Sequence, residues 1–369
     1  MGDTEHFRRG GIALVLGTRP EIIKLSGIAQ LLGPAARIVH TGQHYDHDLA
    51  GSFFEEYGMP APDVVLGIGG VSRGAQIGRV VAQLDRHFAD HPPDAVIVQG
   101  DTNAALAGAL AANAGALPLL HVEAGLRSHD RRMPEEHNRV LVDHLADLCC
   151  APTEVSRANL AAEGISGPRV EITGNTVVEA VRRLLPGREQ RRALLDRMGL
   201  RAGRFVLGTF HRPENVDDPL CLERILRELA ALPLPVVLPL HPRTAQRVRS
   251  HDLCPLLDGL RVLPPVRHAD FLGLAAESAF MVSDSGGVQE EASVLKRPVL
   301  VVRASTERPE VLGTFSELVP PGPRIGEVAT GWIAELEALH GRLDRTPGPY
   351  GDGSASRRSV AALQRLLRR

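Results

Sequence analysis

The stretch IALVLGTRPE, residues 12–21, carries the pattern on which the predicted fold depends. Its five leading residues, 12–16, are apolar without polar alternation, as is typical of a parallel strand that helices cover on both faces. Gly17 ends this run, and a helix is predicted to follow over residues 21–32. A strand that leads directly into a helix is the repeating unit of an α/β fold.

The same alternation of short apolar runs and longer helix-like stretches continues along the chain. A first series of runs lies at 37–40, 95–99, 119–122, 147–151 and 170–173, and a second at 205–209, 236–240, 261–263, 279–283 and 299–302. Helices are expected at 104–114, from about 269, at 288–295 and from about 356. Two βα series of similar length predict two doubly wound domains, residues 1–175 and 176–354, joined near 174–188, and a last helix at 355–369.

Composition excludes several classes of protein. The chain has 369 residues, of which 43% are hydrophobic and 23% charged, with a formal net charge of -2. This length agrees with two domains, and the apolar content excludes a disordered chain. The small net charge and the aromatic content of 4% argue against a nucleic acid or an anionic membrane as partner.

The cysteines and the N-terminal segment indicate the compartment. The four cysteines are scattered without a Cys-X-X-Cys pair, so reduced thiols are expected. The run at 12–16 is shorter than the roughly 7–15 residues of a signal-peptide core. No window approaches the roughly 20 apolar residues of a membrane helix. We therefore expect a soluble, cytoplasmic protein.

The residues after each predicted strand form a candidate ligand site, because open parallel sheets bind ligands beyond the carboxyl ends of their strands. The first series offers Arg19, Lys24, Gln43, His44, Asp101, His121 and Glu123. The second offers His211, Arg212, His241, Arg243 and the segment Ser285-Gly286-Gly287 with Gln289, Glu290 and Glu291. Polar residues at both sets of strand ends predict one cleft between two facing domains.

Two of these groups suggest specific chemistry. The helix that follows Ser285-Gly286-Gly287 presents free N–H groups and a dipole that favour an anion such as a diphosphate, and Arg308 can add a phosphate contact. Asp101, Glu123 and Glu135 are carboxylates suited to general acid and base chemistry.

Each group also has a purely structural interpretation. Asp101 can be a helix N-cap, Glu135 and Glu136 can be first-turn acids that complement the helix dipole, and the glycine-rich helix start can be structural. Gln289, Glu290 and Glu291 cannot share one helix face, so those outside the cleft are expected to be solvated or capping. His211 and His241 lack an HxxxH partner or a third nearby ligand, so no metal is expected.

Nine motifs occur in order along nearly the whole chain. They are GTRPE (17–21), TGQH (41–44), GDT (100–102), HVEAGLR (121–127), MPEEHNR (133–139), TGN (173–175), HRPEN (211–215), DSGGVQEE (284–291) and ERPE (307–310). Together they resemble the non-hydrolysing UDP-N-acetylglucosamine 2-epimerases. The resemblance implies a GT-B-type α/β fold with two Rossmann-like domains facing a central cleft, and a C-terminal helix that packs back on the first domain.

The resemblance also implies a reaction without a cofactor, the reversible inversion at C2 of UDP-GlcNAc to UDP-ManNAc. A base removes the C2 proton, UDP leaves from C1, a 2-acetamidoglucal forms, and UDP returns after protonation on the opposite face. The carboxylates Asp101, Glu123 and Glu135 match the catalytic acids of the family, and His211 matches a histidine near the diphosphate or the proton transfer. A homodimer is expected by analogy.

By motif position, the residues implied to hold UDP are Arg19, Lys24, Ser285, Gly286, Gly287, Glu291 and Arg308. Glu291 would take the ribose hydroxyls, and Phe271 would pack near uracil. Three stretches depart from the family pattern. They are His268 in place of Tyr, residues 317–321 in place of Leu-Val-Gly, and Tyr45-Asp46 in place of the Arg-Glu-Met of members with an activating substrate site.

Other functions are compatible with the same cleft. A hydrolysing relative would release UDP and free ManNAc, and a further relative would epimerise another nucleotide sugar. A GT-B glycosyltransferase would need an acceptor, and the three carboxylates of the first domain argue against it. A UDP-sugar sensor without activity is the remaining alternative, and the filled catalytic positions argue against that one.

Overall fold

The computed structural model describes residues 7–42 and 54–368. The chain divides into two compact units, one formed by Met1–Ala180 with Tyr350–Arg369 and the other by Val181–Pro349. Gln43, His44 and the Tyr45-Asp46 departure lie outside the described residues. Among the residues that are described, no helix combines the length and the apolar character needed to cross a membrane.

The N-terminal unit is built on a seven-stranded parallel sheet of order β3-β2-β1-β4-β5-β6-β7. Its strands are β1 (Ile12–Leu16), β2 (Ala36–His40), β3 (Val64–Val65), β4 (Ala95–Gln99), β5 (Leu119–Val122), β6 (Leu148–Ala151) and β7 (Val170–Ile172). The strand order reverses between β1 and β4, which are hydrogen-bonded neighbours with Ile12 opposite Ala95. Strands β1, β4, β5 and β6 are wholly buried, which explains their continuous apolar sequences.

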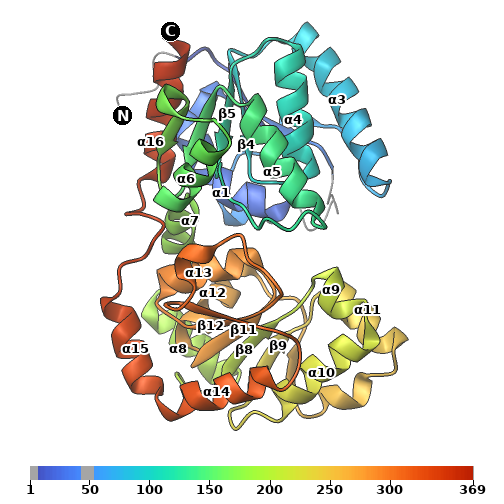
Figure 1. Ribbon diagram of the computed structural model, residues 1–369, viewed down its shortest axis with the longest axis vertical. Helices are drawn as coiled ribbons and strands as arrows, with labels where there is room; N and C mark the ends of the chain where they lie inside the picture. Colours follow the sequence, from blue (N-terminus) through green and yellow to red (C-terminus); the bar gives the residue numbers. More distant parts are fainter. Residues whose placement is uncertain (1–6, 43–53, 369) are drawn as a thin grey trace. The chain divides into compact units, whose positions relative to one another are not determined.

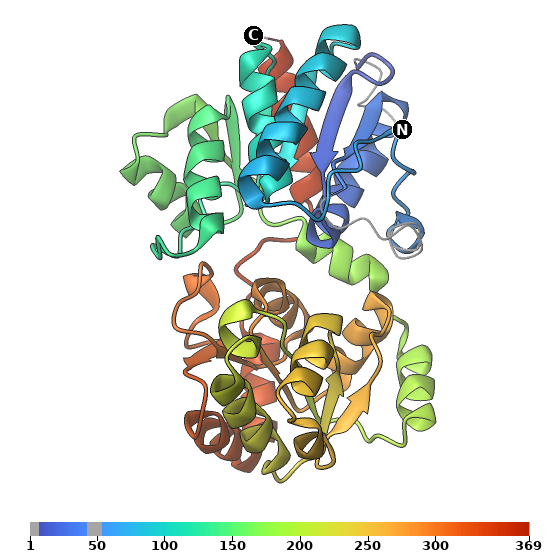
Figure 2. The ribbon, with the colours of Figure 1, turned by 90° about the vertical axis from the view of Figure 1, so that its right-hand side faces the viewer.

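Helices cover both faces of this sheet (Figures 1 and 2). They are α1 (Arg19–Leu32), α3 (Arg73–Asp90), α4 (Asn103–Ala114), α5 (Pro134–Leu145), α6 (Glu154–Ala162), α7 (Val177–Leu184), which crosses the unit boundary, and α16 (Ala355–Leu367). One core lies between the sheet and α3, α4, α5 and α6. On the other face α16 packs against α1 and β6, so the end of the chain completes the N-terminal unit.

The C-terminal unit repeats this design with a six-stranded parallel sheet of order β10-β9-β8-β11-β12-β13. Its strands are β8 (Val206–Thr209), β9 (Val236–Pro239), β10 (Arg261–Leu263), β11 (Phe280–Ser283), β12 (Val299–Val302) and β13 (Ser316–Val319). Its helices are α8 (Arg188–Arg197), α9 (Pro213–Val216), α10 (Pro219–Ala230), α11 (Pro242–Ser250), α12 (His268–Glu277), α13 (Gly286–Leu295), α14 (Arg324–Ala334) and α15 (Leu336–Arg345). Two apolar cores lie on the two faces of the sheet.

The prediction of two doubly wound α/β units is confirmed, with corrections to individual elements. Strands β3 and β13 were not predicted, and the predicted helices correspond only to α1, α4, α12, α13 and α16. Strand β3 has only two residues, and β13 begins with Ser316 and Glu317, so neither forms an apolar run. Helix α13 begins at Gly286 and not at residue 288, because glycine is accepted in a first turn whose N–H groups need no partner within the helix. Short 3-10 helices occur at Gly33–Ala35, Gly167–Arg169, Cys254–Leu257 and Pro309–Val311.

Candidate active site

In the N-terminal unit, the point where the strand order reverses is tied together by one buried carboxylate. Glu21 accepts hydrogen bonds from the N–H groups of Gly17 and Thr18 at 2.9 and 2.8 Å, and from the Thr102 hydroxyl at 2.8 Å. Burial raises the pKa of Glu21 to about 7, against the opposing effect of these hydrogen bonds. The turn after β1 and the turn after β4 are thereby joined where doubly wound sheets bind ligands.

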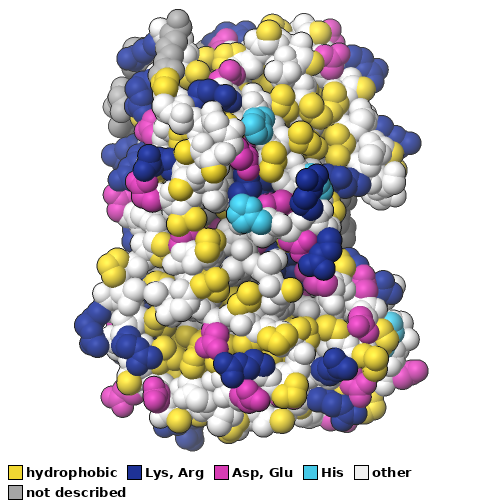
Figure 3. Space-filling model, viewed as in Figure 1, with side chains coloured by type: hydrophobic (Ala, Val, Ile, Leu, Met, Phe, Trp, Pro, Cys, Tyr) yellow, Lys and Arg dark blue, Asp and Glu magenta, His cyan; other side chains and the backbone are white. Residues whose placement is uncertain are grey.

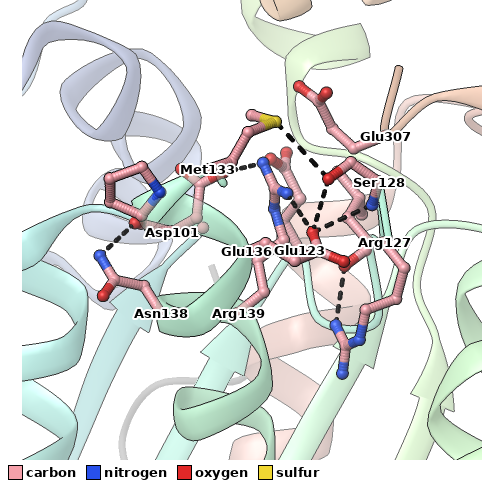
Figure 4. A network of polar contacts seen from close by, with 12 residues as sticks. Asp101, Glu123, Arg127, Ser128, Met133, Glu136, Asn138, Arg139 and Glu307 are labelled. Carbon is pink, nitrogen blue, oxygen red and sulfur yellow. Dashed lines mark hydrogen bonds and ion pairs between the residues drawn. The ribbon is translucent and has the colours of Figure 1, made fainter. Parts of the chain in front are cut away.

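Asp101 follows β4 and is held from α5. Its carboxylate is paired with the guanidinium of Arg139, and its carbonyl oxygen accepts a hydrogen bond of 2.8 Å from the Asn138 amide (Figure 4). Its side chain stays 32% exposed, so it can reach a ligand. The N-cap of α4 is Thr102, whose hydroxyl accepts from the N–H of Ala105 at 3.0 Å. The interpretation of Asp101 as the N-cap is therefore wrong.

Glu123 follows β5 and is buried, with 8% of the residue exposed. Its carboxylate is paired with the ammonium of Lys24 and accepts a hydrogen bond of 2.9 Å from the Asn175 amide. The backbone of Glu123 is left-handed, with φ of 68°. Such a conformation is uncommon for a residue with a Cβ, so the surrounding contacts must hold it in place.

Glu135 and Glu136 occupy the first turn of α5 and have different environments. Glu135 is exposed. Glu136 is buried and accepts from the N–H of Ser128 at 3.0 Å, from the N–H of His129 at 2.7 Å and from Arg139 (Figure 4). Burial by itself would raise the pKa of Glu136, but these hydrogen bonds and the Arg139 charge hold it below its usual value. Glu136 therefore fixes the loop before α5 and leaves Glu135 accessible.

In the C-terminal unit, His211 follows β8, at the corresponding reversal of strand order. The ring Nδ1 of His211 lies 3.3 Å from Asp284 Oδ1, and the backbone N–H of His211 also donates to the Asp284 carboxylate. The carboxylate of Asp284 is fully buried and further accepts from the N–H of Arg212 at 3.0 Å and the Asn215 amide at 3.1 Å. Burial alone would raise the pKa of Asp284, but the interactions with His211, Arg212 and Asn215 keep it below its usual value.

The two histidines at this edge do not complete a metal site. The rings of His211 and His241 lie 5.5 Å apart with a tilt of 39°. Over residues 7–42 and 54–368, no group of three or more His, Cys, Asp or Glu side chains is arranged to hold a metal ion.

The N-terminus of α13 lies against the loop that carries Arg308. Arg308 donates from Nε to Glu290 at 2.7 Å and is also paired with Glu307. A Cβ added at Gly286 would come within 2.5 Å of Arg308 Nη1, so this glycine allows the guanidinium to approach the first turn of the helix. An ordered guanidinium beside free N–H groups is suited to binding a phosphate.

The glutamine and the two glutamates on α13 are all buried, which corrects the expectation that some of these side chains are solvated. Gln289 and Glu290 are 0% exposed, and Glu291 is 7% exposed. Glu291 is paired with the His268 ring at 2.8 Å. The ring of Phe271 is stacked on His268, with centroids 6.2 Å apart and an angle of 18°. Glu291 and Phe271, expected near ribose and uracil, are therefore joined through His268.

The predicted site residues divide between the two units. The N-terminal unit carries Arg19, Lys24, Asp101, Glu123 and Glu135, and the C-terminal unit carries His211, Phe271, Ser285, Gly286, Gly287, Glu291 and Arg308. Arg19 is the first residue of α1 and is half-buried, and Ser285 precedes α13 as its N-cap. Sequence reasoning missed the structural partners Glu21, Arg139, Asp143, Asn175 and Asp284, although all but Asp143 lie within the quoted motifs.

On the face drawn in Figure 3, basic and acidic side chains are interspersed over both units.

The family model described as UDP-N-acetylglucosamine 2-epimerase matches residues 33–364. The UDP-N-acetylglucosamine 2-epimerase of Methanocaldococcus jannaschii is 37% identical over 365 residues, which cover 95% of this chain and 98% of that protein. The UDP-2,3-diacetamido-2,3-dideoxy-D-glucuronate 2-epimerase of Pseudomonas aeruginosa is 35% identical and covers 96% of this chain and 99% of its own.

Solved structures agree with this similarity. The M. jannaschii UDP-GlcNAc 2-epimerase in complex with UDP-GlcNAc and UDP superposes with a TM-score of 0.84, covering 96% of this chain and 99% of that chain at 37% identity. The Neisseria meningitidis UDP-GlcNAc 2-epimerase bound to UDP-GlcNAc gives a TM-score of 0.87, with 96% and 99% coverage at 29% identity.

The GT-B-type fold class with two Rossmann-like domains is therefore confirmed. A family model that spans most of the chain, and relatives of this identity over their whole length, lead to one conclusion: the chain belongs to the UDP-N-acetylglucosamine 2-epimerase family.

Proposed function

We propose that this protein is a non-hydrolysing epimerase that interconverts UDP-GlcNAc and UDP-ManNAc. The observation that carries the proposal is the full-length similarity to the M. jannaschii enzyme, whose structure contains UDP-GlcNAc and UDP. The carboxylates Asp101 and Glu123 support it, because both lie at strand ends of the N-terminal unit where ligands bind.

The proposed reaction begins with proton abstraction at C2. A carboxylate of the set Asp101, Glu123 and Glu135 takes the C2 proton, and the electron pair of the C2–H bond forms a C1=C2 double bond. The C1–O bond breaks, and its electron pair leaves with UDP. The 2-acetamidoglucal is then protonated at C2 on the opposite face, and UDP adds again at C1. Atoms and electrons balance over the two halves, so the overall change is the configuration at C2.

The C-terminal unit is proposed to stabilise the leaving diphosphate. The C2 proton is weakly acidic, so the transition state needs charge stabilisation on UDP. Arg308 and the N–H groups at Gly286 and Gly287 offer fixed positive charge and donors, and His211 adds a ring held by Asp284. Ser285, Phe271, Glu291, Arg19 and Lys24 complete the proposed UDP-binding set.

A second candidate substrate follows from one comparison. The P. aeruginosa relative is named for a UDP-2,3-diacetamido-2,3-dideoxy-D-glucuronate and matches this chain almost as closely as the M. jannaschii enzyme does. The same C2 chemistry applies to both sugars, because each is a UDP-sugar that is epimerised at C2. The choice between them depends on substituents at C3 and C6.

Proton NMR of the purified protein in D2O, with each of the two UDP-sugars in turn, tests both proposals. Deuterium at C2 with growth of the 2-epimer supports the proposed reaction and identifies the substrate. Accumulation of UDP and free ManNAc with turnover indicates a hydrolysing enzyme and contradicts the non-hydrolysing proposal. An unlabelled sugar in both arms contradicts epimerase activity on these substrates. The homodimer stays a prediction, which analytical ultracentrifugation checks.

A further inference from the structure

The ring of His121 lies in the interior of the N-terminal unit between two hydrogen-bond acceptors. Nδ1 is 2.7 Å from Asp143 Oδ1, and Nε2 is 2.9 Å from the carbonyl oxygen of Gly100. Neither His121 nor Asp143 is exposed. Burial alone would raise the pKa of Asp143, but the adjoining His121 and Arg127 hold it below its usual value, so the carboxylate is ionised. A carboxylate and a carbonyl only accept, so the ring carries a proton on both nitrogens.

The second oxygen of the Asp143 carboxylate contacts the turn that carries Glu123. Asp143 Oδ2 accepts from the N–H of Gly125 at 3.1 Å and pairs with Arg127 Nη1 at 2.8 Å. Two of three successive residues in this turn are left-handed, Glu123 with φ of 68° and Gly125 with φ of 82°. The left-handed backbone is unfavourable for a residue with a Cβ, so the turn keeps this form only while its contacts hold it.

Through His121 the same carboxylate reaches the other catalytic turn. Gly100 comes directly after β4, and Asp101 is the next residue. The bond from His121 Nε2 therefore holds the carbonyl of the peptide that joins Gly100 to Asp101. Gly100 N–H also donates to the Val122 carbonyl at 3.0 Å. Both the N–H and the carbonyl of Gly100 therefore tie the turn after β4 to residues of β5.

We propose that Asp143 is a positioning residue for proton transfer at C2, which fixes the Glu123 turn directly and the Gly100–Asp101 turn through a doubly protonated His121. This inference rests on the proposed function, because Asp101 and Glu123 are the acids that it positions. Asp143 itself is fully buried and therefore acts through these residues and not on the substrate.

The network contains a matched control for a role in stability alone. Arg127 pairs with Asp143 on one side and with Glu163 on the other, where its Nε and Nη2 donate at 2.8 and 2.7 Å. Glu163 is 27% exposed, and its carboxylate faces the side chains of Arg127 and, at 3.7 Å, His144. Asp143→Asn and Glu163→Gln each remove one negative charge beside Arg127. Only the first also replaces, by an amide NH2 donor, one of the two acceptor oxygens that face His121 and the N–H of Gly125.

The test compares the two variants in the full chain. For Asp143→Asn we expect kcat to fall about 100-fold, because a displacement of about 1 Å in a reacting group costs that much. The Kd for UDP, measured by calorimetry, should stay unchanged, since the proposed UDP groups lie mainly in the C-terminal unit. Glu163→Gln should keep the wild-type kcat. Wild-type kcat in folded Asp143→Asn, or an equal loss with Glu163→Gln, overturns the proposal.

A second variant and a spectrum cover the case in which Asp143→Asn does not fold. In His121→Gln, the single NH2 group of the side chain can take the place of one ring nitrogen, facing either Asp143 or the Gly100 carbonyl, but not of both. The same loss of kcat without loss of UDP affinity is therefore expected. Nitrogen-15 NMR of the wild-type protein should show two N–H groups on the His121 ring, and a single one overturns the arrangement. If the wild type itself exchanges no C2 proton, the proposed function fails, and the ring spectrum still decides the network.

Discussion

The ammonium of Lys24 on α1 is paired with the carboxylate of Glu123 at the end of β5, and both side chains are buried. By motif position, Lys24 is expected among the UDP-binding residues. In the structure it accompanies a carboxylate proposed to transfer a proton. An ionised carboxylate is costly to bury without a compensating charge, so the cation explains how Glu123 can stay ionised in this position.

Removal of Lys24 should therefore be more harmful than removal of the whole pair. Lys24→Met is expected to lower the free energy of unfolding by about 3–5 kcal/mol, because it leaves a buried charge without its main partner. The double variant Lys24→Met/Glu123→Gln should recover part of this loss, because the remaining amide is neutral. Denaturant titrations followed by circular dichroism measure the cycle, and additive effects of the two substitutions would contradict the prediction.

The three proposed acids should each be needed for turnover. Asp101→Asn, Glu123→Gln and Glu135→Gln are expected to lower kcat by about 10²- to 10⁴-fold, the usual contribution of a general acid or base. Glu154→Gln is a control for Glu135→Gln, because Glu154 is also an exposed first-turn acid, on α6. Initial rates from NMR give the comparison. An acid whose variant keeps wild-type turnover does not have the assigned role.

Glu21 should make the stability of the protein depend on pH. Its pKa is raised from 4.5 to about 7 by burial, so the folded state keeps a proton that the unfolded state loses between these values. The stability of the wild type relative to Glu21→Gln should therefore be highest below pH 4.5 and fall as the pH rises to about 7, in total by about 3 kcal/mol.

Denaturant titrations of both proteins at several pH values measure this difference. Comparison with Glu21→Gln removes the opposite effect of Asp143 and Asp284, whose pKa values are held down and whose contributions are lost at low pH. A difference that does not change with pH, or that rises with it, would contradict the buried protonated state of Glu21.

The close approach of Arg308 to α13 predicts a steric test of UDP binding. Gly286→Ala would place a Cβ 2.5 Å from Arg308 Nη1 and 2.7 Å from Glu307 Oε1, so the guanidinium must move. We expect the affinity for UDP to fall by about tenfold or more, the equivalent of about 1.4 kcal/mol. Gly331→Ala in α14 is the matched control, because a Cβ there meets nothing within 4 Å. Calorimetry decides, and equal affinities in the two variants would remove Arg308 from the proposed site.

Local sequence was sufficient for most of the strands but for fewer of the helices. Strands β4 and β5 have the predicted bounds, because parallel strands covered on both faces are short continuous apolar runs. The edge strand β13 lacks such a run, since Ser316 and Glu317 need not face a core on both sides. Helix α3 was not predicted because most of its residues are polar or exposed. Only Gln76, Val80, Leu84 and Phe88 are buried in it.

The candidate site was predictable where motifs mark strand ends, but its partners were not. Asp101 and Glu123 are apparent from their positions after β4 and β5. Asp284 also follows a strand, but its contact with His211 joins residues 73 positions apart, and His121 and Asp143 are 22 apart. No periodicity in the sequence indicates such pairs.

The α/β class, the succession of strands and helices and the places of the polar motifs follow from the sequence, because periodicity and strand termination are local properties of the chain. The pairings of Lys24 with Glu123 and of Asp143 with His121 and the N–H of Gly125 depend on the tertiary structure. They arise because the sheet orders its strands differently from the chain, with β1 beside β4. Burial then selects the partners, since a charged group in the interior is stable only where an opposite charge or a donor meets it.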